Sequence, residues 1–182
     1  MTDHVTAEDC EAAQPMVMAA PRTGGRVTGL CLRPAPNHRS FPDRLQMTRA
    51  EGIPGDRWLT MPWLRLPDGR PDPQIQVSIL QSRVLDLVWR DREGVVHPGD
   101  PIIADMDLSE ANLPAGTLLR AGTAVLKVSQ EPNLGCAKWK VRYGSGSLNW
   151  IKAHPELRLR GVLCSVEEDG EVGLGDRIEV LR

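Results

Sequence analysis

Short apolar runs separated by turn residues make up most of this sequence. In residues 74–80, QIQVSIL, the apolar side chains of Ile75, Val77 and Ile79 alternate with polar ones. This period of two is typical of a half-buried β-strand. Further apolar runs that predict strands occupy residues 25–32, 101–108, 117–130 and 158–181.

Turn and helix signals complete this pattern. Residues 82–91 have helical spacing, with Ser82 as the predicted N-cap, and residues 147–154 form a second predicted helix that stops before Pro155. Asp169-Gly170 stands between two alternating segments and predicts a hairpin. Many short strands, few helices, 17 Gly and 15 Pro favour a mainly β fold, either a barrel or a sandwich.

The chain divides into a short lead-in and one domain. Residues 1–25 are rich in small, acidic and proline residues, and we expect a flexible lead-in in which His4 and Cys10 are exposed and incidental. Residues 26–182 form the single expected domain, because this length suffices for one substantial core. Proline-broken loops interrupt it near residues 33–47 and 60–73, and loops of this length are usually functional or mobile.

Composition excludes several classes of partner. With 22 Lys+Arg against 24 Asp+Glu the net charge is -2, so no large basic field indicates nucleic acid or an anionic membrane. No run approaches the roughly 20 apolar residues that span a bilayer, and the N-terminus has no basic start followed by an apolar stretch. The four cysteines form no C-x-x-C pair, so we expect no zinc ribbon or redox dithiol but a cytoplasmic protein with reduced thiols.

The densest chemistry lies in residues 133–144, NLGCAKWKVRYG. A cysteine reacts as its thiolate, and helix N-termini and nearby cations lower the thiol pKa from about 8.5 into a reactive range. Cys136 has both features nearby in the sequence. However, a helix that starts at Cys136 places Trp139 and Tyr143 on the side of the cysteine and Lys138 and Arg142 on the opposite side. Cys136 is therefore either a packed residue inside the helix or a reactive thiol just before it.

Several segments occur in an order that resembles the MOSC domain, the C-terminal domain of molybdenum cofactor sulfurases. They are GIPGDRW at 52–58, SEANL at 109–113, AGTAVLKVSQ at 121–130 followed by GCAKWKVRYG, and LRGVLCSVEEDGEVGLGDRIEV at 159–180. The resemblance covers residues 26–182. It implies a largely antiparallel β-barrel with a few short peripheral helices.

The resemblance also implies roles for single residues. The family cysteine that follows the AVLKVSQ-like strand corresponds to Cys136, which is then either the persulfide carrier or a molybdenum ligand. The Gly-Cys-x-Lys-aromatic-x-x-Arg-aromatic-Gly motif of one family branch is matched here, whereas the common Gly-Glu-Asn-Leu run matches only at Asn112 and Leu113. Cofactor contacts are expected from Arg57, Asn112, Lys138 and Arg142, the last two suited to a pterin phosphate. Without the family, Lys138 and Arg142 are a solvated helix face and Asn112 is a turn residue.

Three functions follow as hypotheses. The first is a sulfur carrier or sulfurtransferase in molybdenum cofactor metabolism, in which Cys136 accepts sulfur from a separate cysteine desulfurase; pyridoxal phosphate is then expected only on that partner. The second is a molybdenum-cofactor oxidoreductase that reduces N-hydroxylated compounds, with Cys136 as metal ligand and a separate electron-transfer protein, since no flavin or iron–sulfur pattern is present. The third is a non-catalytic barrel that binds a ligand or a partner.

Overall fold

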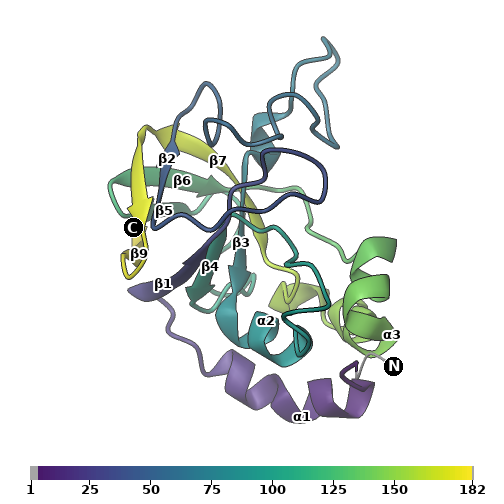
Figure 1. Cartoon of the computed structure of the whole chain (residues 1–182). Coiled ribbons are helices and arrows are strands. Elements are labelled where there is room, and N and C mark those ends of the chain that lie inside the picture. The colour runs from purple at the N-terminus through teal and green to yellow at the C-terminus, as the bar shows by residue number, and fades with distance from the viewer. Residues whose placement is uncertain (1–3, 182) are drawn as a thin grey trace.

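The computed structural model describes residues 4–181, and its centre is a closed β-barrel (Figure 1). The strands follow the barrel wall in the order β1-β4-β3-β7-β6-β5-β9. Their bounds are β1 Gly25–Leu30, β3 Val77–Gln81, β4 Ile102–Asp105, β5 Leu118–Ala121, β6 Ala124–Val128, β7 Val162–Glu168 and β9 Arg177–Leu181. The predicted mainly β class and the barrel are confirmed.

Neighbouring strands of the barrel run antiparallel except for β3 and β4, which run parallel to each other. The connection from β3 to β4 contains helix α2, as a parallel crossover requires a long connection. Strand β9 closes the barrel because it pairs with β1 on one side and with β5 on the other. A separate two-stranded sheet is formed by β2, Arg44–Met47, and β8, Gly170–Gly173.

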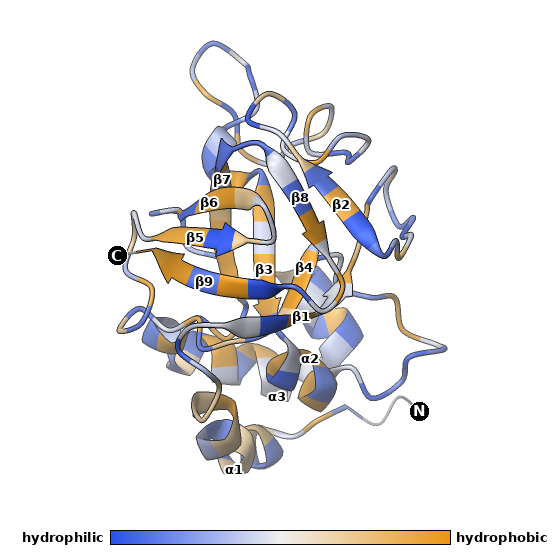
Figure 2. Cartoon of the chain, turned by 90° about the vertical axis from the view of Figure 1, so that its left-hand side faces the viewer, coloured by the Kyte–Doolittle hydropathy of each residue, from blue (hydrophilic) through white to orange (hydrophobic). Residues whose placement is uncertain are grey.

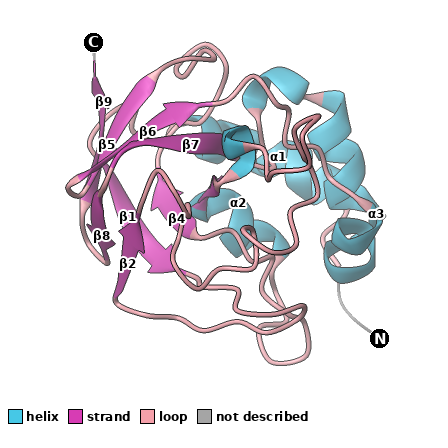
Figure 3. Ribbon diagram, turned by 90° about the horizontal axis from the view of Figure 1, so that it is seen from above, coloured by secondary structure: helices cyan, strands magenta, loops and turns pink. Residues whose placement is uncertain are grey.

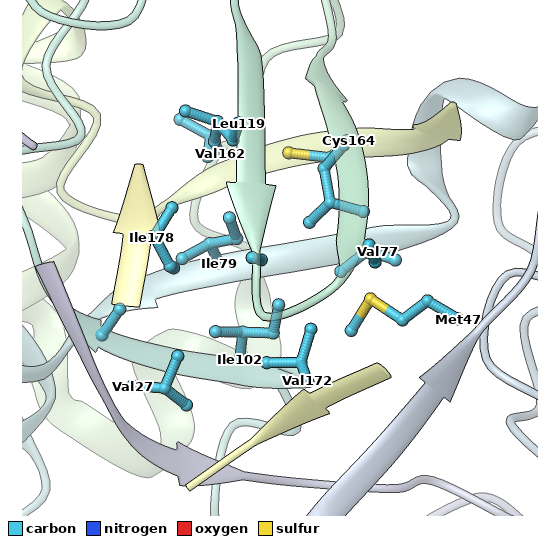
Figure 4. Packing of buried hydrophobic residues seen from close by; sticks show 14 of the residues in the cluster. Val27, Met47, Val77, Ile79, Ile102, Leu119, Val162, Cys164, Val172 and Ile178 are labelled. Atoms are coloured by element: carbon cyan, nitrogen blue, oxygen red, sulfur yellow. The ribbon is translucent and has the colours of Figure 1, made fainter. Parts of the chain in front are cut away.

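The main hydrophobic core fills the barrel interior. Side chains from all seven barrel strands and from the β2–β8 sheet belong to one buried cluster. Figure 4 shows part of it, with Ile79, Ile102 and Ile178 pointing toward one another and Met47 and Val172 entering from the small sheet. The β2–β8 sheet therefore contributes to the same core as the barrel.

Three helices lie together on one side of the barrel (Figure 3): α1 Ala7–Met18, α2 Ser82–Val88 and α3 Ala137–Ala153. A second buried cluster joins them to the outer surface of the wall, where Leu80 of β3 and Ile103 of β4 face the helices. All five residues of β3 are buried, so this strand is covered on both faces rather than half-buried as the alternation predicted. Two short 3-10 turns, Pro73–Ile75 and Pro155–Leu157, precede β3 and follow α3.

The expectation of a flexible lead-in over residues 1–25 is wrong for most of that segment. Residues 7–18 form α1, and Thr6 caps the helix because its side chain accepts from Asp9 N–H while the Asp9 carboxylate accepts from Thr6 N–H. Val17 and Cys10 are buried against the other helices, so Cys10 is not exposed as expected. Residues 1–3 lie outside the described part of the chain.

The N-terminal segment also crosses α3 closely. A Cβ at Gly146 would lie 2.7 Å from the Val5 carbonyl oxygen, and a Cβ at Gly144 would lie 2.7 Å from the His4 Cβ. Gly144 has a φ of 86° and interrupts the helical backbone of α3. The glycines of the GSGS sequence therefore let the N-terminal segment approach the helix.

Two local predictions are corrected by the strand partners and the cap. Asp169-Gly170 does not close a hairpin, because β7 pairs with β3 and β6 whereas β8 pairs with β2. The turn instead takes the chain from the barrel wall into the second sheet. The N-cap of α2 is Gln81 rather than Ser82, and it makes no side-chain cap bond.

Candidate functional site

Cys136 lies at the N-cap of α3, immediately before the helix. Its backbone is extended, with φ -117° and ψ 177°, and its carbonyl oxygen accepts from Lys140 N–H at 3.1 Å. The residue is exposed. Of the two arrangements that the sequence left open, the structure shows the second, in which the thiol escapes the packed face of the helix.

The other three cysteines are buried and have raised pKa values. Burial raises the pKa of Cys10 and of Cys31 to about 11, and that of Cys164 to about 12. Cys164 belongs to the apolar cluster of the barrel interior, whereas Cys31 is buried within reach of the charges of Arg39 and Arg33. All four cysteines belong to the described residues, so Cys136 is the single exposed thiol among them.

Helix α3 holds Cys136 in place through its aromatic side. Trp139 and Tyr143 are buried with their ring centroids 4.6 Å apart, so the side of the helix that carries them packs into the core. The Tyr143 hydroxyl donates to the Val96 carbonyl oxygen at 2.7 Å. Arg160 stacks over the Trp139 ring at 4.8 Å and pairs with the buried Asp100 carboxylate at 2.8 Å. The helix start is therefore fixed to the barrel by packing and by an ion pair.

Arg57 and Arg142 are brought together although 85 positions separate them. Burial lowers the pKa of Arg57, and the positive charges of Arg33 and Arg142 lower it further. Burial also lowers the pKa of Arg39, and Arg142, Arg57 and Arg33 act in the same direction. Arg33, Arg39, Arg57 and Arg142 thus share one region, which we call the arginine cluster.

The PGD turn at 54–56 organises one half of this cluster. The buried Asp56 carboxylate accepts from Arg33 Nε at 2.9 Å and from Arg33 Nη2 at 2.8 Å, a bidentate pair. It also accepts from Trp58 N–H at 2.9 Å, and Arg57 N–H donates to the Arg33 carbonyl oxygen at 2.8 Å. Asp56 therefore fixes the loop that presents Arg57.

The other cationic side chains of the cluster have no carboxylate partner. Among the described residues, no ion pair joins Arg39, Arg57 or Arg142 to an acid; Arg142 Nη2 contacts Asn37 Oδ1 at 3.5 Å, and Arg39 Nη1 donates to the His38 carbonyl oxygen. Arg39 Nε is buried and has no hydrogen-bond partner. Buried polar groups are rarely left unpaired, so this concentration of donors fits an anionic ligand.

A glycine makes room for Arg39. A Cβ at Gly99 would lie 2.7 Å from Arg39 Nε and 2.9 Å from Arg39 Cζ, and the φ of Gly99 is 94°. Gly99 N–H donates to His97 Nδ1 at 3.0 Å, which requires the neutral ring, and burial lowers the pKa of His97 to about 4. The His97 ring is held edge-on between Phe41 at 5.3 Å and Trp89 at 5.0 Å.

The remaining predicted residues are placed differently. Lys138 is exposed on the first turn of α3, four residues before Arg142. Asn112 makes no contact with Cys136 or the arginine cluster: its amide group donates to the carbonyl oxygens of Arg22 and Asp107, and its oxygen accepts from Arg22 Nε. These bonds give Asn112 a structural role in fastening the segment that leads into β1.

A cavity of about 340 Å³ is lined in part by the segment that leads to Cys136. Asn133, Leu134 and Arg160 are in its lining, but Cys136 and the arginine cluster are not. Because its lining mixes acidic, basic and apolar side chains without a shared chemistry, we assign the site to the thiol and the arginines instead.

Sequence reasoning found Cys136, Arg57 and Arg142 but missed Arg33 and Arg39. Both lie in the RPAPNHRSF segment, which was predicted only as a long loop. The presence of two arginines and two prolines in that segment was the available signal. Within residues 4–181, no group of three or more His, Cys, Asp or Glu side chains is arranged to hold a metal ion.

The helices in the described part of the chain are all too short or too polar to cross a membrane.

Comparison with known proteins agrees with this architecture. The MOSC domain model matches residues 99–179. The chain is similar to the crystal structure of the YuaD protein from Bacillus subtilis, with a TM-score of 0.61, 22% identity, and coverage of 86% of this chain and 94% of that one. For YiiM from Escherichia coli the TM-score is 0.55 at 20% identity, with 86% of this chain and 70% of that one covered.

YiiM from Geobacillus stearothermophilus is also similar, with a TM-score of 0.51, 15% identity, and coverage of 88% of this chain and 74% of that one. At these identities the structural likeness shows the fold alone. No curated protein matches the chain. Residues 99–179 therefore match the MOSC domain, and the barrel that contains them is similar in fold to these solved structures.

Proposed function

We propose that this chain is a MOSC-domain protein that carries sulfur in molybdenum cofactor metabolism and that Cys136 accepts the sulfur. The observation that supports this most directly is the contrast among the thiols. Cys136 is exposed just before a helix, whereas Cys10, Cys31 and Cys164 are buried with raised pKa values. A carrier thiol must be reached by both a donor and an acceptor, and Cys136 meets that requirement.

The proposed reaction is a thiol–persulfide exchange. The Cys136 thiolate attacks the outer sulfur of the donor's persulfide, R–S–SH. A new S–S bond forms at Cys136, the old S–S bond breaks, and the donor leaves as the thiolate R–S⁻ with the electron pair of the broken bond. The products are Cys136–S–SH and R–S⁻, and no external oxidant or reductant is needed.

The arginine cluster would bind the anionic acceptor beside this thiol. Arg142 lies six residues after Cys136, about 9 Å along the helix axis. Within residues 4–181, Arg39, Arg57 and Arg142 have no carboxylate partner, and the buried Arg39 Nε has no hydrogen-bond acceptor. A pterin phosphate fits this set of donors, and Lys138 adds an exposed cation on the same helix. The substrate would then be the molybdenum cofactor, held by its phosphate.

A second function uses the same residues. In a molybdenum-cofactor oxidoreductase, Cys136 would be the single protein ligand of the metal and the arginine cluster would hold the pterin phosphate. The bound cofactor would supply the redox centre. The exposed Cys136 thiol is the observation behind this alternative, in which the other metal ligands would come from the cofactor itself.

The test of the carrier function is a sulfur-loading experiment. The reduced protein is incubated with a cysteine desulfurase and cysteine, and its intact mass is measured, with Cys136→Ala as the control. We expect a gain of one sulfur atom that maps to the Cys136 peptide and is absent from the variant. An unmodified Cys136, under conditions that load a known carrier, contradicts the proposal.

The two functions separate by metal content. The protein is produced in a host that makes the molybdenum cofactor, and bound molybdenum is measured together with the fold. If the unmodified protein contains stoichiometric molybdenum and the Cys136→Ala variant does not, the oxidoreductase is favoured. Molybdenum-free folded protein whose Cys136 still loads with sulfur favours the carrier.

A further inference from the structure

The segments that carry the candidate site also expose large apolar side chains. We name six of them the apolar rim: Phe41, Leu59, Met61, Trp63, Leu134 and Val141, with exposed fractions from 41% for Leu59 to 78% for Val141. Each lies between one and six residues from Arg39, Arg57, Cys136 or Arg142 in the sequence. Single exposed apolar residues are ordinary, but a group around one site marks an interaction surface.

Contacts between loops join the segment that carries Phe41 and Arg39 to α3 and to the segment before β4. Phe41 packs on His97, which lies beside the Gly99 backbone that Arg39 covers. Arg142 of α3 contacts Asn37 of the loop that carries Arg39. The 31–43 loop, the start of α3 and the segment before β4 are therefore neighbours, and Figure 1 shows them on the side of the barrel where the helices lie.

The loop at 57–72 presents its apolar residues from a fixed base. Trp58 is buried with Ile75 and Leu163 in a small core of its own, and Leu64 packs against it. Met61 N–H donates to the Arg57 carbonyl oxygen at 2.7 Å, so the chain turns directly after Arg57. Trp63 stands out from this anchored loop with 67% of its surface exposed. Its exposure is thus a property of an organised loop, seen at the top of Figures 1 and 2.

The positive charge of this surface indicates which kind of partner would bind it. Residues 133–143 contain Lys138, Lys140 and Arg142 and no acid, in a protein whose net charge is -2. The unneutralised arginines of the cluster lie next to them. A surface with apolar anchors and a cationic centre complements an acidic surface with apolar side chains, which steers association as well as binding. A small persulfide donor would need only the exposed thiol.

Resting on the proposed carrier function, we infer that the apolar rim and the arginine cluster form the docking surface for the protein that delivers sulfur to Cys136, an acidic partner with exposed apolar side chains. Docking there places the partner's persulfide over the thiol. The same surface then holds the anionic acceptor after the donor has left. Donor and acceptor must therefore bind in turn.

The experiment compares two donors on the same variants. A cysteine desulfurase with cysteine is the protein donor, and glutathione persulfide is the small donor. The test variant is Met61→Ser/Trp63→Ser. The control is Met16→Ser/Leu174→Ser, which removes apolar residues with exposed fractions of 47% and 46% outside the site. Sulfur loading of Cys136 is followed by intact mass over time.

We expect loading of the test variant from the protein donor to slow by about tenfold, because truncation of large apolar anchors at an interface can have an effect of this size. The rate at which glutathione persulfide loads the test variant stays unchanged. The control variant is loaded by both donors at the rates of the unmodified protein. Added salt slows the protein donor more than the small one. Unchanged loading of the test variant from the protein donor overturns the inference, and so does equal slowing with both donors.

The outcomes also separate this inference from the proposed function. If neither donor loads Cys136 in the unmodified protein, the carrier function itself fails and the docking surface with it. If both donors load Cys136 but the rim variant binds phosphatidylserine vesicles less than the unmodified protein, with protein-donor loading unchanged, the surface belongs to a membrane and the inference is wrong.

Discussion

Arg39 lies directly across the backbone of Gly99, so that the guanidinium occupies the space a Cβ at Gly99 would need. The absence of a side chain at Gly99 thus leaves the space in which the Arg39 guanidinium joins the arginine cluster. Because Gly99 also has a positive φ, the effect of a substitution on Arg39 must be separated from backbone strain.

Gly99→Ala is expected to weaken anion binding. The new methyl group displaces Arg39, and loss of a charged hydrogen bond typically weakens binding by roughly tenfold or more. Calorimetric titration with inorganic pyrophosphate measures the change. Gly116→Ala is the matched control, since Gly116 has a φ of 89° and open space around its Cβ position. Equal pyrophosphate affinity in both variants contradicts a role for Arg39.

Alkylation of the folded protein at neutral pH is expected to modify Cys136 first. The thiols of Cys10, Cys31 and Cys164 have pKa values raised by burial to about 11 or 12, so their reactive thiolates are scarce, and the side chains are inaccessible. Iodoacetamide treatment followed by peptide mapping should show one adduct, and four after unfolding. Faster labelling of any buried cysteine than of Cys136 would be incompatible with this structure.

Acidification is expected to destabilise the fold through His97. Burial lowers the pKa of His97 from 6.5 to about 4. The unfolded chain therefore binds the proton at a higher pH than the folded one, so stability is fully present above about pH 6.5 and falls as the pH drops toward 4. The loss is on the order of 3 kcal/mol.

The check is the pH dependence of urea unfolding in the unmodified protein and in His97→Asn. The asparagine side chain offers an acceptor to Gly99 N–H but does not titrate. We expect a shallower decline of the unfolding free energy between pH 6.5 and 4 in the variant. An identical decline in the two proteins would show that other groups control the acid sensitivity.

Thr6→Ala is expected to lower the free energy of unfolding by about 1 kcal/mol, the usual effect of removing a helix N-cap. The lost bond is the one that the Thr6 hydroxyl accepts from Asp9 N–H, whereas the backbone N–H of residue 6 still donates to the Asp9 carboxylate. Thermal or urea unfolding measures the difference, with Glu8→Gln in the same helical turn as the comparison. A stability equal to that of the unmodified protein would mean that α1 does not contribute to the cooperative fold.

The sequence predicted the barrel because strand alternation and turn residues are local properties. The sequence could not predict which strands pair. Asp169-Gly170 has the residues of a hairpin turn, but a Cβ at Gly170 would lie 2.4 Å from Ala124 N, so the chain passes close to the β5–β6 turn. It then enters the other sheet, where β8 pairs with β2. Helix α1 was missed because few of its residues are apolar and buried. Its signal was the Thr6 cap, three residues before Asp9.

The candidate site was predicted in part, because only some of its residues lie close together in the sequence. Cys136 and Arg142 share one short motif, and the aromatic face of α3 follows from helical spacing. Arg33 and Arg39 join them only in three dimensions, through the Asp56 ion pair and through the space at Gly99. Asn112 was expected at the site from its surrounding motif, but its hydrogen bonds tie it to Arg22 and Asp107.

The pairing of β1 with β9 has a consequence for the order of events during synthesis. The first strand of the barrel meets its last partner only after residues 177–181 have left the ribosome. Because translation adds roughly 5–20 residues per second, the edge of β1 that pairs with β9 stays unpaired for on the order of ten to thirty seconds. Folding of this barrel is thus expected to be slow, since its closing contacts are far apart in the chain.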